Sequence, residues 1–289
     1  LLIMEDPESG NTLIEIPKVL SDTNFRKYKL SKCKNIVVKN FWEQEAEKAG
    51  GEASLANMVP YITSKMNVFI ANDMVRPIIS QQKSAFNMRD IMDNRKILIV
   101  NLAKGKLGDI NSFLLGMIIV GKILLAAFSR VDIGEEKRKN FFLYIDEFQN
   151  VTTKTISAVL SEARKYHLAM TFGHQFIGQL EEDIRKAVFG NVGSMLSFRI
   201  GPEDAKFLLT QYEPIFDEND LVNLDNYNGA LRFLINGQTS NPFNIQTYSP
   251  SQGNSEVAGL IKELSRRKFG KRKDLVEAEL NNRLKTKFI

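Results

Sequence analysis

The chain has 289 residues, 43% of them hydrophobic, which is enough to bury the core of one large domain or two smaller ones. The single cysteine, Cys33, excludes an internal disulfide and fits a reducing cytosolic compartment, and two histidines leave zinc with almost only carboxylate ligands. The net charge of +5 is uneven, because residues 262–289 carry ten Lys or Arg against four Asp or Glu. This basic tail is either a solvated helical face or a binding surface.

Residues 1–94 have a mainly helical pattern. At its start, "TLIEIP" (12–17) predicts a short strand that Pro17 stops. Residues 18–93 predict irregular helices, among them an amphipathic helix in "VPYITSKMNVFI" (59–70), whose apolar residues share one face. "EKAGGEAS" (47–54) predicts a loop.

From residue 95 the pattern changes to strands that alternate with helices. This order predicts βαβ units and a mostly parallel sheet. The expected strands are 97–102, 141–145, 168–175, 194–200, 229–236 and 243–248, with a turn at Asn236-Gly237 between the last two. The main expected helices are 110–129, 155–166, a helix in each of "QLEEDIRKAV" and "PEDAKFLLTQY", 254–268 and 273–287.

The most apolar stretch is "FLLGMIIVGKILLAAF", residues 113–128. It contains Lys122 and is shorter than the roughly 20 residues that a membrane-spanning helix needs. The sequence therefore predicts a helix buried in the protein.

Two adjacent carboxylates follow an apolar strand in "FFLYIDEFQN" (141–150). An unbroken apolar run is typical of a parallel strand covered on both faces, and ligands of open parallel sheets bind at the carboxyl ends of the strands. Asp146 and Glu147 lie at such an end, and Gln175 lies at the end of the next strand. This set suits phosphoryl transfer to water, with Asp146 holding Mg²⁺ through water, Glu147 polarising the attacking water, and Gln175 contacting that water or the γ-phosphate. The alternative is a purely structural turn or helix cap.

The ordered set "LYIDEFQN … LSEARKYHLAMTFGHQF … FGNVGSMLSFRIGPEDAKFL" resembles the FtsK/HerA superfamily of P-loop ATPases. It is most similar to TraG/TraD-type coupling proteins of conjugative type IV secretion. The resemblance covers residues 95–250 well, and residues 1–94 are more loosely similar to the all-α segment of that family. It implies an α/β fold with the C-terminal half of a RecA-like three-layer core at 95–250, a helical insertion at 1–94, and a linker with a basic helical tail at 251–289.

The resemblance also implies a function. Members of the family form homo-hexameric rings that hydrolyse ATP with Mg²⁺ and move single- or double-stranded DNA through a central channel. Asp146 and Glu147 then belong to the Walker B element, and Gln175 ends the sensor strand. Arg164 is the expected arginine finger, although Arg164 and Lys165 also suit a plain helix C-terminus. Secretion-channel proteins are expected partners, at the cytoplasmic side of the membrane, with any anchor in a segment outside this chain.

One departure from the family is clear: the sequence contains no G-x-x-x-x-G-K-[ST] phosphate cradle. We therefore expect the Walker A segment to lie upstream in a longer protein, and the 289-residue chain alone to show no ATP hydrolysis. Two alternatives remain: a HerA-like DNA-processing translocase, and a catalytically degenerate module that binds DNA or proteins.

Overall fold

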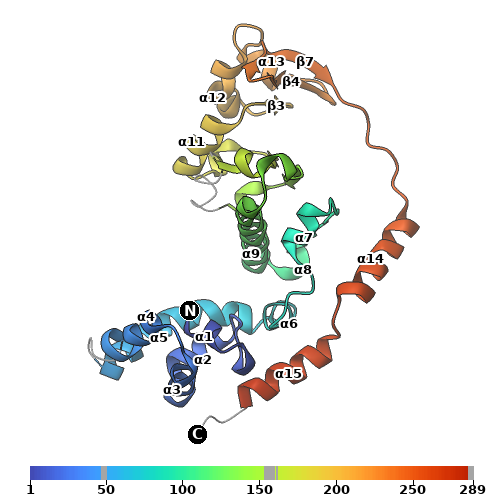
Figure 1. Ribbon diagram of the computed structural model, residues 1–289. Helices are drawn as coiled ribbons and strands as arrows, with labels where there is room; N and C mark the ends of the chain where they lie inside the picture. The colour runs from blue at the N-terminus through green and yellow to red at the C-terminus, as the bar shows by residue number, and fades with distance from the viewer. Residues whose placement is uncertain (47–50, 153–159, 161, 286–289) are drawn as a thin grey trace. The chain divides into compact units, whose positions relative to one another are not determined.

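A computed structural model describes residues 1–46, 51–152, 160 and 162–285 (Figure 1). The chain divides into two compact units: unit 1 comprises Leu1–Asn87, Ala103–Asn111 and Ser255–Ile289, and unit 2 comprises Met88–Leu102 and Ser112–Asn254. Half of the predicted helix 155–166 and half of the predicted loop 47–54 lie outside the described residues. The three-part functional division at 94 and 250 stays a prediction.

Unit 1 is helical in its described part. Its core gathers apolar side chains from the first four α-helices, with Trp42 partly buried against them: Leu2, Val19, Phe25, Leu30 and Val38. Its helices are α1 (Leu2–Glu5), η1 (Pro7–Ser9), α2 (Glu15–Ser21), α3 (Thr23–Lys32), α4 (Ile36–Asn40), the π-helical η2 (Phe41–Ala46), α5 (Gly51–Ile70), α6 (Arg76–Ile79), α8 (Lys104–Leu107), α14 (Ser255–Phe269) and α15 (Lys273–Lys285).

The strand predicted at 12–17 is wrong, because a helix, α2, begins at Glu15. Pro17 lies in the first turn of this helix, where its missing N–H breaks no intrahelical hydrogen bond. The Glu15 carboxylate is buried and accepts hydrogen bonds from the backbone and hydroxyl of Thr12 at 2.8 and 2.6 Å. The loop predicted up to residue 54 is also too long, since α5 begins at Gly51.

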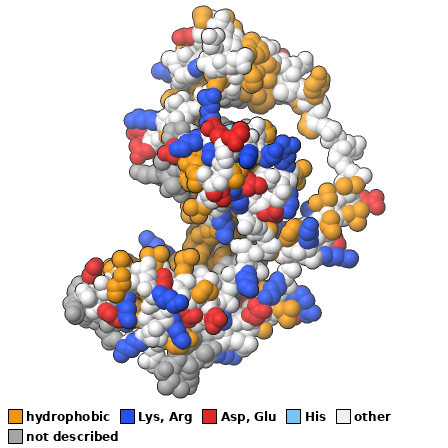
Figure 2. Space-filling view, viewed as in Figure 1, with side chains coloured by type: hydrophobic (Ala, Val, Ile, Leu, Met, Phe, Trp, Pro, Cys, Tyr) orange, Lys and Arg blue, Asp and Glu red, His pale blue; other side chains and the backbone are white. Residues whose placement is uncertain are grey.

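The two tail helices are confirmed, and they differ from each other. Helix α15 buries Val276 and Leu280 in unit 1, and Arg283 donates to Ser80 O at 2.7 Å and pairs with Glu15. Helix α14 has no buried residue. It exposes an apolar stripe beside basic side chains (Figure 2): Val257, Leu260, Ile261 and Leu264 are 47–66% exposed.

Unit 2 is a mixed α/β unit, which confirms the predicted fold class at that level. Its central core lies between α9 and the inner face of strands β1 and β2. Its described elements are α7 (Met88–Asp93), α9 (Asp109–Phe128, which begins in unit 1), η3 (Ser129–Asp132), η4 (Glu135–Lys137), β1 (Phe141–Ile145), η5 (Phe148–Asn150), η6 (Ala163–Tyr166), β2 (Leu168–Phe172), η7 (Ile177–Gln179), α11 (Glu182–Asn191), β3 (Met195–Ser197), α12 (Pro202–Tyr212), α13 (Glu218–Val222), β4 (Asn228–Arg232), β5 (Leu234–Ile235), β6 (Gln238–Thr239) and β7 (Phe243–Gln246).

Strands β1 and β2 pair in parallel, with Phe141 opposite Leu168 and Ile145 opposite Phe172. The prediction that β1 is covered on both faces is wrong for this chain. Its odd-numbered residues pack against the core, whereas Phe142 and Tyr144 are 60% and 71% exposed. An apolar run in the sequence does not by itself show that other elements pack against both faces of the strand.

The strand predicted at 97–102 is not formed. Leu98 and Leu102 pack against the core, while Ile97 and Ile99 are 89% and 84% exposed. The segment therefore alternates like a strand, but it has no strand partner in the described part of the chain.

The other described strands are antiparallel, in the order β3-β4-β7, so the predicted mostly parallel sheet is not what these strands form. Residues 233–242 connect β4 to β7. A connection this short can join antiparallel strands, whereas parallel neighbours need a longer crossover. Within residues 233–242, β5 and β6 form a hairpin whose predicted turn is confirmed: Asn236 and Gly237 have φ of 50° and 82°, as a two-residue hairpin turn needs.

Helix α9 and the turn after it, residues 109–132, are the one segment among the described residues that is long and apolar enough to cross a membrane. Core helices of soluble proteins can share this length and apolar composition. Five of its residues are buried in the core of unit 2, which supports the predicted buried helix: Val120, Ile123, Leu124, Ala126 and Ala127.

Candidate functional site at the strand ends

Asp146, Glu147 and Gln175 follow two strands that end at the same edge. Because β1 and β2 are parallel and in register, the segments after Ile145 and Phe172 leave the sheet together. Two backbone hydrogen bonds continue the pairing past the strands: Gly173 N donates to Ile145 O at 2.9 Å, and Phe148 N donates to Gly173 O at 3.0 Å. The structure thus brings the carboxylates and the glutamine to one place.

Glu147 is held by two amide side chains. Gln175 donates its Nε2 to Oε1 of Glu147, and Gln149 donates its Nε2 to Oε2 at 2.6 Å. Both donors are neutral, so the carboxylate is oriented without being paired to a cation. Gln149 was not among the predicted site residues, although its spacing in "DEFQN" places it within reach of Glu147.

The backbone at Glu147 is strained. Its φ of 50° and ψ of 46° lie in the left-handed region, which costs a non-glycine residue on the order of 1 kcal/mol or more. The next side chain, Phe148, is fully buried and packs against Phe172 with ring centroids 4.9 Å apart. The buried phenylalanine anchors the turn, and the strained conformation turns Glu147 toward Gln175.

Asp146 is exposed, and its Oδ1 accepts a hydrogen bond from Glu147 N at 3.0 Å. A Cβ atom on Gly173 would lie only 3.1 Å from that oxygen, so the glycine makes room for the carboxylate. Among the described residues no group of three or more His, Cys, Asp or Glu gathers as a metal cage. One exposed carboxylate beside a second one fits a magnesium ion bound through its water shell.

His174 is packed between aromatic side chains. Its ring lies edge-on to Phe148 and Phe189, with centroids 5.4 and 6.4 Å apart. Burial lowers the pKa of His174 below its ordinary value of 6.5, although Asp204 and Glu147 oppose that shift. The carboxyl end of the strands is therefore kept free of an imidazolium.

Arg164 lies at the other end of β2. It is an exposed residue of η6, between the buried Ala163 and Tyr166. The five residues of β2 span about 16 Å at 3.3 Å per residue, so the strand separates Arg164 from Gln175. The structure therefore does not bring the predicted finger to the carboxylates of its own chain.

No protein-family model matches the sequence, and no curated protein matches it. Solved structures of the plasmid coupling protein TrwB do match. The unbound form of TrwBΔN70, described as a bacterial conjugative coupling protein, is 13% identical with a TM-score of 0.57 over 83% of this chain. The complexes with the ATP analogue ADPNP and the GTP analogue GDPNP are 12% and 13% identical, with TM-scores of 0.57 and 0.58 over 85% of this chain.

The chain has the fold of a conjugative coupling protein. The predicted resemblance to TraG/TraD-type proteins is thus confirmed at the level of fold, which is as far as identities of 12–13% reach. The chain spans 59–60% of the TrwB chains that it matches.

Proposed function

We propose that these 289 residues are the water-activating part of an ATP-hydrolysing DNA translocase, a conjugation or type IV secretion coupling ATPase. The observation that carries this proposal is the pair of amides on Glu147, which fixes a carboxylate at the joint end of two parallel strands. Fixed in that way, Glu147 polarises a water, Gln175 contacts the same water, and Asp146 binds Mg²⁺ through its hydration shell. TrwB was solved with ATP and GTP analogues, which supports nucleotide as the ligand.

The phosphate cradle comes, in this proposal, from polypeptide upstream of these residues. Exposed apolar side chains support additional polypeptide over this part of unit 2. Between 60% and 89% of each side chain is exposed for Phe142 and Tyr144 on β1 and for Ile97 and Ile99. A further strand and helix over this face would complete a RecA-like three-layer core and bury that surface, which is worth roughly 25 cal/mol per Å².

The homo-hexameric ring and a trans-acting Arg164 belong to the same proposal. Arg164 and Glu147 lie at opposite ends of the strand pair, so a second copy is needed to bring a finger to each water site. DNA in the central channel and secretion-channel partners at the cytoplasmic side of the membrane complete the proposed assembly. The alternatives are a HerA-like DNA-processing translocase and a catalytically degenerate binding module, for which the orienting amides on Glu147 would have no purpose.

The test of the proposed function is Glu147→Gln in a protein that joins these residues to their P-loop segment. The amide keeps the size of the side chain but cannot accept a proton, so turnover should fall about 10²- to 10⁴-fold while Mg-ATP still binds. Steady-state hydrolysis and nucleotide titration measure the two effects. Glu203→Gln, on the exposed first turn of α12, is the matched control and should hydrolyse ATP normally.

Hydrolysis by Glu147→Gln within a few-fold of wild type would remove Glu147 from the reaction and favour the degenerate module. Loss of nucleotide binding together with turnover would place the residue in the cradle instead.

A further inference from the structure

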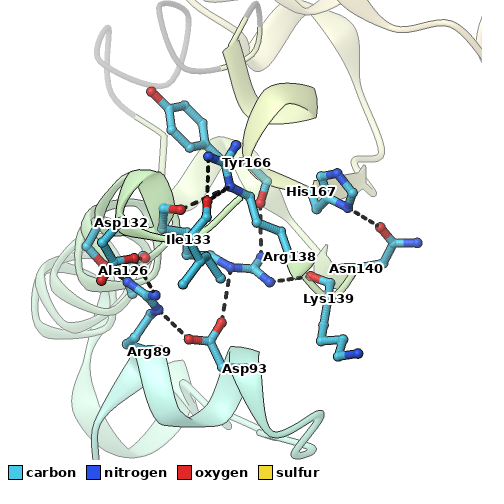
Figure 3. A network of polar contacts seen from close by, with 12 residues as sticks. Arg89, Asp93, Ala126, Asp132, Ile133, Arg138, Lys139, Asn140, Tyr166 and His167 are labelled. Atoms are coloured by element: carbon cyan, nitrogen blue, oxygen red, sulfur yellow. Dashed lines mark hydrogen bonds and ion pairs between the residues drawn. The ribbon is translucent and has the colours of Figure 1, made fainter. Parts of the chain in front are cut away.

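Two arginines from outside the site, Arg130 and Arg138, donate hydrogen bonds to the turn that carries Arg164. Figure 3 shows the network of polar contacts to which Arg138, Tyr166 and Asp93 belong. The turn, η6, is followed by His167 in a left-handed conformation with φ of 54°. Arg130 comes from η3 after the long helix α9, and Arg138 comes from the connection before β1. Both donate to backbone carbonyls of the turn.

Arg130 is fully buried, at 0% exposure. Its Nη1 donates to Tyr166 O at 2.9 Å, its Nη2 donates to Lys139 O, and its Nε lies 3.1 Å from Oδ1 of Asp93. Burial lowers the pKa of this guanidinium, and Asp93 opposes the shift. Burying a cation is unfavourable unless fixed partners surround it, so Arg130 ties the turn to the edge of β1 and to α7.

Arg138 is half-buried, and it holds the neighbouring carbonyl. Its Nη1 donates to Lys165 O at 2.7 Å, while Nε and Nη2 donate to Ile133 O at 3.2 and 3.0 Å. Its guanidinium carbon lies 6.0 Å from the ring centroid of Tyr166. The carbonyls of Lys165 and Tyr166, which directly follow Arg164, are thus each fixed by an arginine.

A side chain that must reach a neighbouring subunit needs a rigid base, because a displacement of about 1 Å in a reacting group can cost 10²-fold in rate. Arg164 itself is exposed, and no hydrogen bond or ion pair holds its guanidinium within the described part of the chain. The backbone of η6 therefore fixes the point from which this side chain extends.

We propose that Arg130 and Arg138 are positioning residues for Arg164: by holding the two carbonyls after it, they set where the finger points. This inference rests on the proposed trans role of Arg164. It predicts that replacing Arg130 or Arg138 impairs the action of that subunit's Arg164 on a neighbouring subunit. The Glu147 site of the same subunit should stay intact.

The experiment uses Arg138→Gln, because Arg138 is only half-buried, whereas replacing the fully buried Arg130 would leave Asp93 without its cation and destabilise the fold. In the full protein with its P-loop, Arg138→Gln should lower kcat at least tenfold and leave KM for Mg-ATP unchanged. Mixed with Glu147→Gln subunits, it should recover activity as Arg164→Ala does, since an intact Glu147 then meets a held Arg164. Mixed with Arg164→Ala subunits, it should recover none.

The matched control is Arg185→Gln. Arg185 is also half-buried in unit 2 and stacks on a ring, with its guanidinium carbon 5.3 Å from the centroid of Phe207, but it belongs to α11. Arg185→Gln should keep kcat near wild type. A comparison of the two variants therefore separates the role of Arg138 from the general effect of losing an arginine stacked on a ring.

A second measurement needs no activity. The backbone N–H of His167 donates to Arg164 O at 3.0 Å, so Arg138→Gln in the 289-residue chain should speed hydrogen exchange at His167 and leave the amides of β4 unchanged. The inference is overturned if Arg138→Gln has wild-type kcat and exchange, or if its lost activity is not recovered beside Glu147→Gln. If Arg164→Ala subunits also recover no activity beside Glu147→Gln subunits, the trans role of Arg164 is wrong. This result distinguishes failure of the proposed finger from failure of the positioning role of Arg138.

Discussion

The two ends of the β1–β2 strand pair carry opposite chemistry. At the carboxyl end, Asp146 and Glu147 are oriented by neutral amides and a backbone N–H, with no cation paired to them among the described residues. At the amino end, Arg130 and Arg138 hold carbonyls of the turn, and Arg164 points into solvent. The acids are thus poised to attract a cation and a water, and the arginine to meet a negative charge.

The contrast teaches that one short strand can keep two sets of chemically complementary side chains apart. A strand of five residues is rigid and about 16 Å long, so neither set can reach the other within one chain. In the proposed function, these complementary ends would meet across the interfaces of a head-to-tail ring, in which every interface is the same.

The largest effect should come from removing the finger. Arg164→Ala is expected to lower turnover about 10³- to 10⁵-fold, because the finger neutralises charge in the transition state. In rings that mix Arg164→Ala with Glu147→Gln subunits, some interfaces join an intact Glu147 to an intact Arg164, and activity should return in part. Hydrolysis measured against mixing ratio gives the answer.

For this experiment, mixed rings must be demonstrated, for example by co-purification through a tag on one variant. If such rings stay inactive, the two ends do not act across an interface and the comparison fails.

A smaller effect concerns the carboxyl end alone. Because burial lowers the pKa of His174 below 6.5, the folded state binds fewer protons there than the unfolded state does. The free energy of unfolding should therefore be highest above about pH 6.5 and fall as the pH drops below it. Denaturant unfolding at pH 7.5 and 5.5 measures this loss, and His174→Gln should reduce it.

The His174→Gln variant is expected to be less stable at both pH values, because it loses ring packing against Phe148 and Phe189. The test of His174 is therefore the difference in the free energy of unfolding between pH 7.5 and pH 5.5. A variant with the wild-type difference would show that another group causes the acid loss.

The smallest effect is expected in the basic tail, away from both strand ends. If α14 contacts nucleic acid, replacing its basic residues with Gln should flatten the salt dependence of DNA binding by about 0.9 in slope for each lost phosphate contact. The change in slope should be smaller than four lost contacts would give, because Arg266 and Arg267 each lie 2.8 Å from a carboxylate oxygen of Glu263, which already pairs with them. The substituted residues are Lys262, Arg266, Arg267 and Lys268.

The matched control replaces four exposed lysines of the N-terminal helical segment: Lys27, Lys32, Lys34 and Lys65. An equal change in slope for both sets would mean that net charge alone is measured. No change for the α14 set would leave it a solvated face.

Sequence reasoning could single out the candidate site residues because the relevant signals are local. An apolar strand followed by Asp146 and Glu147 needs no partner to be recognised, and the order of motifs predicted the coupling-protein fold. It could not predict the contacts of Arg130 and Arg138, because a hydrogen bond to a backbone carbonyl leaves no residue pattern. It also failed at 97–102 and on the outer face of β1, where strand formation and burial depend on neighbours that no short window contains.

The packing of α15 against unit 1 bears on the order of folding. Glu15 and Arg283 are 268 positions apart, yet they lie 3.2 Å from each other, with Val276 and Leu280 buried in the same unit. During synthesis, Glu15 must wait for Arg283 before this ion pair can form, whereas residues 88–254 of unit 2 have already been made. Unit 2 can therefore fold before this pair forms, and a ribosome that stops before residue 273 leaves the buried Glu15 carboxylate without its arginine.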